Sequence, residues 1–202
     1  MKKYLLISIA LVLLLFSCKE EEAINLHKYA GLPDATQSGE NTMGCLMNGI
    51  PWVANIENPD IFSGLNRLEA NYGENRKNQN DYDRYYLDLK CNKRAEKDKK
   101  YINGYRILEK FYMRLRPLRN IGVYNLDFFE IKDLQYVKSN EDEQDKQYIV
   151  DTNAPFRFEI TKFDTIQNIV SGLFDFRLKE IDDSKDTLRI TNGRFDANYW
   201  PL

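Results

Sequence analysis

Few side chains in this sequence could support catalysis or bind a metal. The 202 residues include one histidine, His27, and three cysteines, Cys18, Cys45 and Cys91. A nucleophilic cysteine needs a neighbouring base, and a zinc site needs several cysteine or histidine ligands at short spacing. His27 has no such neighbours in the sequence, which also lacks a phosphate-binding glycine loop and a Gly-x-Ser-x-Gly motif. We therefore predict no catalytic residue, no metal and no cofactor.

The position of Cys18 indicates a different chemistry. Two lysines near the N-terminus precede an apolar run from Leu5 to Phe16. As a helix this run is about 18 Å long, too short for a hydrocarbon core of about 30 Å, and it is typical of a signal peptide over residues 1–17. The residues Leu15-Phe16-Ser17-Cys18 resemble a lipobox, in which the cysteine thiol takes a diacylglyceryl group. We expect lipidation of Cys18 and attachment to a membrane through this lipid anchor.

A charged cluster follows this cysteine directly. Lys19, Glu20, Glu21 and Glu22 resemble the export signal of Bacteroidota lipoproteins, a lysine followed by acidic residues, which directs a lipoprotein to the outer face of the outer membrane. A solvated charged tether is the alternative interpretation. We expect an outer-membrane protein that faces the cell exterior, with a lipid-anchored tether over residues 18–41, where glycine, proline and small polar residues occur.

The charge balance excludes general nucleic-acid binding. The chain carries 29 basic and 31 acidic side chains, a formal net charge of −2, so it lacks the positive field that neutralises phosphates. Hydrophobic residues make up 43% and aromatic residues 13% of the sequence, which favours a folded, strand-rich domain over disorder. Beyond the signal peptide and the tether, we expect a single domain over residues 42–202.

Alternation of apolar and polar residues predicts the fold class. It runs through at least five segments, at 85–91, 111–116, 156–161, 174–179 and 188–191. A period of two places successive side chains on opposite faces of a strand, so that one face packs into a core and the other faces water. We predict a mostly β protein, an antiparallel β-sandwich or partly open barrel of roughly eight to ten strands. The charged stretch 134–147 lacks an apolar stripe, and we expect a solvated loop there.

Glycine-containing pairs predict where strands turn or bulge. Asn48-Gly49 lies between two apolar runs, which favours a two-residue β-hairpin because both turn positions need positive φ. Ser171-Gly172 inside a strand predicts a bulge or a close approach of neighbouring atoms. Asn192-Gly193 predicts a further kink before Phe195.

With Cys18 assigned to the lipid, Cys45 and Cys91 remain in the domain. Both lie on predicted strands of an exported protein, so a disulfide between them and two buried free thiols are both open. A disulfide requires the two Cα atoms to lie within about 7 Å.

Calcium prefers carboxylate oxygens, but neither of two aspartate clusters, at 81, 83 and 88 and at 182, 183 and 186, matches a calcium-binding loop.

Two blocks resemble an uncharacterised family of Bacteroidota lipoproteins. The first runs from Leu32-Pro33-Asp34-Ala35-Thr36-Gln37 to Gly44-Cys45-Leu46-Met47-Asn48-Gly49, and the second includes Ile190-Thr191-Asn192-Gly193-Arg194-Phe195-Asp196. The family form is a Leu-Pro-Pro-Ala-Thr-Gln tether and a Gly-Cys-Leu-Val-Asn-Gly hairpin, so this chain departs at Asp34 and Met47. The resemblance implies a lipoprotein location and a β fold, and it implies no activity.

Two tripeptides resemble O-glycosylation acceptors of Bacteroidota proteins, Asp164-Thr165-Ile166 and Asp186-Thr187-Leu188. They make Thr165 and Thr187 candidate O-glycosylation sites, although aspartate and threonine are also ordinary turn residues.

The sequence favours a non-enzymatic binding or interaction module for a glycan or protein partner. Its candidate contact residues are Tyr85, Tyr86, Tyr112 and Trp52, although packing in a core is the commoner role of each. The alternative is an extracellular polysaccharide hydrolase with a carboxylate pair in a deep cleft. A structural envelope component without a small ligand is a third interpretation.

Overall fold

The computed structural model describes residues 31–55, 68–74, 85–94, 108–129, 133–140 and 143–201. These ranges contain eleven strands: β1 (Thr42–Met47), β2 (Ile50–Val53), β3 (Leu68–Glu74), β4 (Tyr85–Arg94), β5 (Leu108–Leu115), β6 (Gly122–Tyr124), β7 (Leu134–Asn140), β8 (Glu143–Val150), β9 (Arg157–Asp164), β10 (Ile169–Glu180) and β11 (Thr187–Pro201). A short 3₁₀ helix, η2 (Leu126–Phe128), follows β6. The predicted mostly β fold is confirmed.

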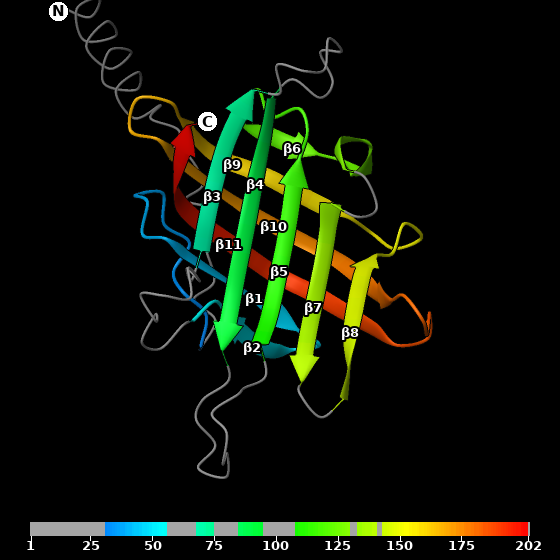
Figure 1. Cartoon of the computed structure of the whole chain (residues 1–202). Coiled ribbons are helices and arrows are strands. Elements are labelled where there is room, and N and C mark those ends of the chain that lie inside the picture. Colours follow the sequence, from blue (N-terminus) through cyan, green and yellow to red (C-terminus); the bar gives the residue numbers. More distant parts are fainter. Residues whose placement is uncertain are drawn as a thin grey trace, which may run out of the picture.

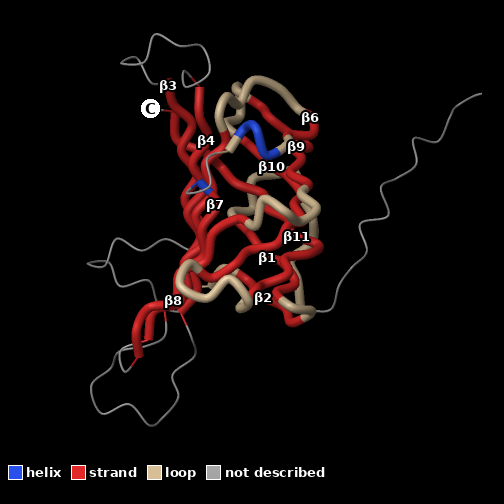
Figure 2. Tube along the Cα trace, turned by 90° about the vertical axis from the view of Figure 1, so that its right-hand side faces the viewer, coloured by secondary structure: helices blue, strands red, loops and turns tan. Residues whose placement is uncertain are grey.

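The strands form two crossed layers. In Figure 1 the layer β3-β4-β5-β7-β8 runs vertically in front of the oblique layer β6-β9-β10-β11-β1-β2, and Figure 2 shows the two layers from the side. Two corners join them, because β11 pairs with β3 in parallel and β8 pairs with β10 antiparallel. The strands β11, β3, β4, β5, β7, β8 and β10 thereby close a ring, which is intermediate between a sandwich and a barrel.

The prediction of a solvated loop at 134–147 is wrong, because β7 and β8 form a hairpin there with Tyr136 opposite Tyr148. The side chains that this hairpin buries are Leu134, Tyr136, Tyr148 and Val150. Its charged residues lie near the hairpin end, where Lys138, Asp145 and Lys146 are exposed. The apolar alternation is therefore confined to the two ends of this stretch, with the charged residues between them. With β7 and β8 the described ranges contain eleven strands, one more than the upper limit of the predicted eight to ten.

The predicted alternation builds the core between the layers. Buried positions repeat at every second residue, as in Leu87, Leu89 and Cys91 of β4, Phe111, Met113 and Leu115 of β5, and Phe174, Phe176 and Leu178 of β10. The Phe111 ring lies 6.4 Å from that of Phe174 and 6.2 Å from that of Phe176 between centroids. Such pairs add about 0.5–1.5 kcal/mol beyond their buried area, so ring contacts help to hold the crossed layers together.

The glycine-containing pairs act as predicted. Asn48 and Gly49 have φ values of 51° and 82° and connect β1 to β2 in a tight hairpin. The β9–β10 register shifts between Ser171 and Gly172. A Cβ atom on Gly193 would collide with the Phe174 ring and lie 2.6 Å from the Phe174 carbonyl oxygen. The absence of a side chain at Gly193 therefore lets β11 and the Phe174 ring approach closely.

Residues 33–40, which we call the N-terminal strap, lie against the outer face of the oblique layer. Arg194 and Asp196 alternate with buried Phe195 and Ala197, so they point away from the core, yet they are only 5% and 1% exposed. The strap contacts both, and Nη1 of Arg194 lies 3.4 Å from the Pro33 carbonyl oxygen. The last part of the segment expected as a tether is therefore bound to the domain.

The Asp196 carboxylate is the centre of this attachment. It accepts hydrogen bonds from hydroxyl and backbone N–H groups: Thr36 Oγ1 at 2.6 Å, Ser171 Oγ at 2.7 Å, and the nitrogens of Ser38 at 3.0 Å, Gly39 at 2.9 Å and Glu40 at 3.1 Å. Burial raises the pKa of Asp196, but these hydrogen bonds outweigh burial and hold the pKa below its ordinary value. The ionised carboxylate thus joins the strap to β10 and β11.

We expect Asp196→Asn to lower the free energy of unfolding by about 3 kcal/mol at neutral pH, because an amide cannot accept all of these hydrogen bonds. A lowered folded-state pKa stabilises the fold above the ordinary aspartate pKa of about 3.9, and this contribution is lost as the pH falls through the folded-state value. The stability difference between wild type and variant should therefore shrink in acid. Urea unfolding at several pH values measures it, with exposed Asp34→Asn as the control in the same strap. A pH-independent difference would contradict this account.

We expect Gly193→Ala to lower the free energy of unfolding by about 1–3 kcal/mol, because the added methyl group must displace the Phe174 ring. Phe174→Leu removes part of that ring, so the double variant should lose less stability than the sum of the single variants. Urea unfolding of all three proteins gives this coupling energy. Strictly additive losses would show that the ring is not what excludes a side chain at position 193.

Candidate functional site

Trp200 is the most exposed large hydrophobic side chain at the corner where β11 meets β3. It is 72% exposed, whereas Trp52 is 2% exposed. The last β11 residue paired with β10 is Asn198, after which Tyr199, Trp200 and Pro201 pair with β3. Tyr199 is buried, so the alternation directs Trp200 outward. Figure 1 shows this end of β11, in red, beside β3.

A pocket of about 810 Å³ lies at this corner. We call it the Trp200 pocket and define it by seven of its lining residues, which come from four parts of the chain: Asn198 and Trp200 of β11, Glu69 of β3, Gln167 and Asn168 of the β9–β10 turn, and Glu40, the last strap residue, with Asn41 directly after it. Its volume falls within the range of about 300–1,000 Å³ that small-molecule sites occupy.

Hydrogen bonds fix the strap side of this pocket. The Asn198 N–H donates to Oδ1 of Asn41 at 2.9 Å, and the Asn198 side-chain amide donates to the Gly39 carbonyl at 2.5 Å. The N–H groups of Gly39 and Glu40 bind Asp196. The strand that carries Trp200 therefore also positions the facing residues Glu40 and Asn41.

The turn side is held through the backbone. Asp164 accepts hydrogen bonds from the N–H groups of Gln167 and Ile166, both at 2.9 Å, which hold the Asp164 pKa below its ordinary value. The Tyr199 N–H donates to the Asn168 carbonyl at 2.8 Å. The side-chain amides of Gln167 and Asn168 make no hydrogen bond within the described ranges. Both amides are therefore free to bind a ligand.

The pocket combines an apolar surface with hydrogen-bonding groups. Glu40 and Glu69 line it, and no basic side chain does. Oε1 of Glu69 accepts a hydrogen bond from the Asn71 amide at 2.9 Å. The same oxygen lies 3.8 Å from Nζ of Lys90. Amides donate and accept, carboxylates accept, and an indole face packs against C–H groups. This set suits an uncharged ligand rich in hydroxyl groups and is unfavourable for an anion.

Trp52 and Tyr85, two of the expected contact residues, have packing roles. The Trp52 indole N–H donates to Oε2 of Glu109 at 2.5 Å, and its ring lies 5.6 Å from that of Phe111. Trp52 is therefore a core residue. The Tyr85 ring stacks on Tyr72 at 6.3 Å. Neither side chain lines the Trp200 pocket.

Tyr86 and Tyr112 lie on either side of Arg114 on β4 and β5. The Arg114 guanidinium carbon lies 5.4 Å from the Tyr86 ring centroid and 5.6 Å from that of Tyr112. Arg114 also pairs with Asp88 at 2.5 Å. These tyrosines thus pack against a cation that is already paired, and they lie outside the Trp200 pocket.

Asp88 and Asp186, one from each of the two aspartate clusters, are engaged in ion pairs. Asp88 pairs with Arg114, and Asp186 binds Lys146 at 2.9 Å and the Tyr148 hydroxyl at 3.0 Å. Asp81 and Asp83 lie outside the described residues. Among the residues that the structure does describe, no group of three histidine, cysteine or acidic side chains is arranged to hold a metal.

Cys45 and Cys91 are buried free thiols, so the disulfide considered between them is not formed. Burial raises the pKa of Cys45 to about 12 and raises that of Cys91 well above its ordinary value. Both therefore stay protonated at neutral pH, and the thiolate is the nucleophilic form.

The structure places the remaining predicted residues as follows. Thr165 is exposed in the β9–β10 turn, and Thr187, the first residue of β11, is half-buried. Cys18, Lys19, Glu20, Glu21, Glu22 and His27 lie outside the described residues.

The residues of the Trp200 pocket were absent from the sequence predictions. A signal for Trp200 existed, because the alternation continues after Phe195 through the buried residues Ala197 and Tyr199 and places Trp200 on the opposite face. No comparable local pattern in the sequence indicates residues 40–41 and 167–168. These residues line the pocket only because segments that are distant in the sequence pair in the fold.

No helix among the described residues is long and apolar enough to cross a membrane. No protein-family model matches the chain, and neither a curated protein nor a solved structure is significantly similar to it.

Proposed function

We propose that this chain is a lipid-anchored binding module on the outer face of the outer membrane, and that it binds a neutral saccharide in the Trp200 pocket without catalysing a reaction. The exposed indole beside unpaired amide side chains carries the saccharide part of the proposal. Cys18 and the charged cluster after it support the location.

A saccharide ring matches the groups of the pocket. Its hydroxyl groups both donate and accept hydrogen bonds, as do the amides of Gln167, Asn168 and Asn41. Its C–H face is apolar and packs on an indole. The carboxylates of Glu40 and Glu69 accept from sugar hydroxyls and repel acidic sugars. A concave pocket of about 810 Å³ also suits one or a few sugar units better than a flat protein partner.

The alternative function, polysaccharide hydrolysis, would use the same pocket. Glu40 and Glu69 are the two carboxylates that line it, and glycosidases use two such groups. Release of reducing ends from a bound oligosaccharide, abolished by Glu69→Gln, would replace the binding proposal with hydrolysis. Binding without release supports a non-enzymatic module.

We expect the purified protein, with the strap retained, to bind neutral oligosaccharides on a glycan array, and Trp200→Ala to weaken binding about thirtyfold, which corresponds to about 2 kcal/mol for a central aromatic contact. Trp200→Phe should retain most of the affinity because it keeps an aromatic face. Titration calorimetry with the best array ligand measures these changes. Ile166→Ala, which removes another exposed apolar side chain, is the control, and an equal loss in that variant would contradict the assignment.

We expect protease added to intact cells to remove the full-length protein from its outer-membrane fraction. Cys18→Ser should abolish metabolic labelling with a fatty acid and release the protein from membranes, because the lipid is the proposed anchor. Immunoblots of cell fractions with and without protease measure both effects. A periplasmic protein serves as the control for cell integrity. Protection of the wild-type protein in intact cells would overturn the exterior location.

A further inference from the structure

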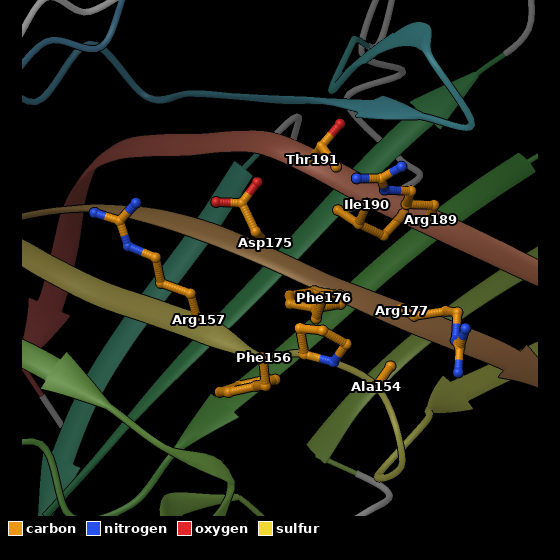
Figure 3. Close-up of a pocket in the computed structure, with 10 residues that line it drawn as sticks. Ala154, Phe156, Arg157, Asp175, Phe176, Arg177, Arg189, Ile190 and Thr191 are labelled. Carbon is orange, nitrogen blue, oxygen red and sulfur yellow. The ribbon is translucent and has the colours of Figure 1, made fainter.

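A second pocket, of about 550 Å³, lies where β9, β10 and β11 run side by side. Each strand contributes one arginine to its lining, Arg157 from β9, Arg177 from β10 and Arg189 from β11. Figure 3 shows these arginines spaced around Phe156 and Phe176. We call this site the arginine pocket and define it by these five residues.

The inner surface of the arginine pocket is apolar. The Phe156 and Phe176 rings are stacked, with their centroids 5.8 Å apart and their planes inclined by 18°. Phe176 is buried, as is Ile190 beside it. Phe176 and Ile190 thus form a rigid base in the core, and the half-buried Phe156 is the aromatic surface that the pocket offers to a small organic ligand.

The charged groups of the pocket are mainly positive. Asp175 is the one acidic side chain among the lining residues, against three arginines. Oδ1 of Asp175 accepts the Asn192 N–H at 2.8 Å, at the point where the register between β10 and β11 shifts. Two of the three arginines are compensated by acidic side chains just outside the lining, so the positive charge available to a ligand comes mainly from the third, Arg189.

Two of the arginines are held in place by ion pairs that leave some of their N–H groups free. Nη2 and Nε of Arg177 lie 2.6 and 2.7 Å from Oδ2 of Asp151, and Nη2 of Arg157 lies 2.6 Å from Glu159. A guanidinium has five N–H donors, so each arginine retains donors for a ligand. Asp151 and Glu159 thus position these side chains.

Arg189 differs from the other two. It is exposed, and within the described ranges its guanidinium makes no ion pair or hydrogen bond. Its N–H groups can therefore bind a ligand without breaking a contact in the protein. Arg189 is the lining residue whose loss should weaken an anionic ligand most.

We propose that the arginine pocket binds an oxyanion, a carboxylate, sulfate or phosphate group, whose attached organic body packs against the half-buried Phe156. Guanidinium groups form paired, charge-assisted hydrogen bonds with such anions. The charged side chains that line the Trp200 pocket are acidic, so an anionic group that binds the arginines is unfavourable there. The oxyanion site is independent of the saccharide proposal.

Titration calorimetry on the purified protein, with the strap retained, tests this site with three probes at low ionic strength. The probes are methyl glucuronide, its neutral counterpart methyl glucoside, and sodium sulfate. In the Trp200→Ala variant, which disables the proposed saccharide site, we expect methyl glucuronide to bind at least about tenfold more tightly than methyl glucoside, the change expected from one charge-assisted contact. Added salt should weaken this binding, because the contact is electrostatic and partly exposed.

Arg189→Gln should weaken methyl glucuronide binding about tenfold. Lys138→Gln makes the same change of charge at an exposed site in the other layer and should leave the affinity unchanged. Trp200→Ala should also leave it unchanged, which separates this site from the Trp200 pocket. Circular dichroism verifies that each variant is folded.

Three results would overturn all or part of the proposal. Equal binding of methyl glucuronide and methyl glucoside in the Trp200→Ala variant, where the Trp200 pocket lacks its indole, or no binding of either anionic probe, would overturn the oxyanion site. An equal loss of affinity in Arg189→Gln and Lys138→Gln would show that only the overall charge matters. Equal affinity for sulfate and methyl glucuronide would support the oxyanion site but overturn the contact with Phe156, and would identify a free inorganic anion as the ligand source.

Discussion

The attachment of the strap to Asp196 is the interaction on which the Trp200 pocket depends. One buried carboxylate accepts hydrogen bonds from the backbone of Ser38, Gly39 and Glu40, and from hydroxyl groups on the strap and on β10. Without it, both the strap and the outer side of β11 would have unpaired polar groups at a buried surface. The cost of burying the charge is offset because several donors surround it. The beginning of the described chain is thereby fixed to its last strand.

The crossing of the two layers creates both pockets. β11 pairs with β10 and β1 in the oblique layer and then with β3 in the other layer, so its last residues lie at a corner where the Trp200 side chain is 72% exposed. On β10, the partner changes from β9 at Asp175 to β8 at Leu178. The arginine pocket lies at this change of partner. Both sites thus occur where one long strand passes from one neighbour to another.

Local pattern predicted much of the fold and little of the candidate sites. The turn at Asn48-Gly49 and the alternating core strands follow from positive φ and from a period of two, which involve only neighbouring residues. The hairpin at 134–147 was missed because its apolar positions are split by a charged end. The role of Asp196 could not be predicted, because its partner Thr36 is 160 residues away in sequence. The arginines were also missed, since alternation identifies an outer face but does not show which strands lie side by side.

The strap makes the two pockets respond differently to events at the N-terminal side of the chain. Glu40 and Asn41 line the Trp200 pocket directly beyond the backbone groups that bind Asp196, so that wall exists only while the strap is bound. A ligand that contacts either residue binds the strapped form selectively and must therefore stabilise strap attachment, by thermodynamic linkage. The arginine pocket takes no residue from the strap, so its ligand has no such coupling. If the chain is anchored through Cys18, a pull on the anchor would reach the domain at the strap and would weaken saccharide binding while leaving oxyanion binding intact.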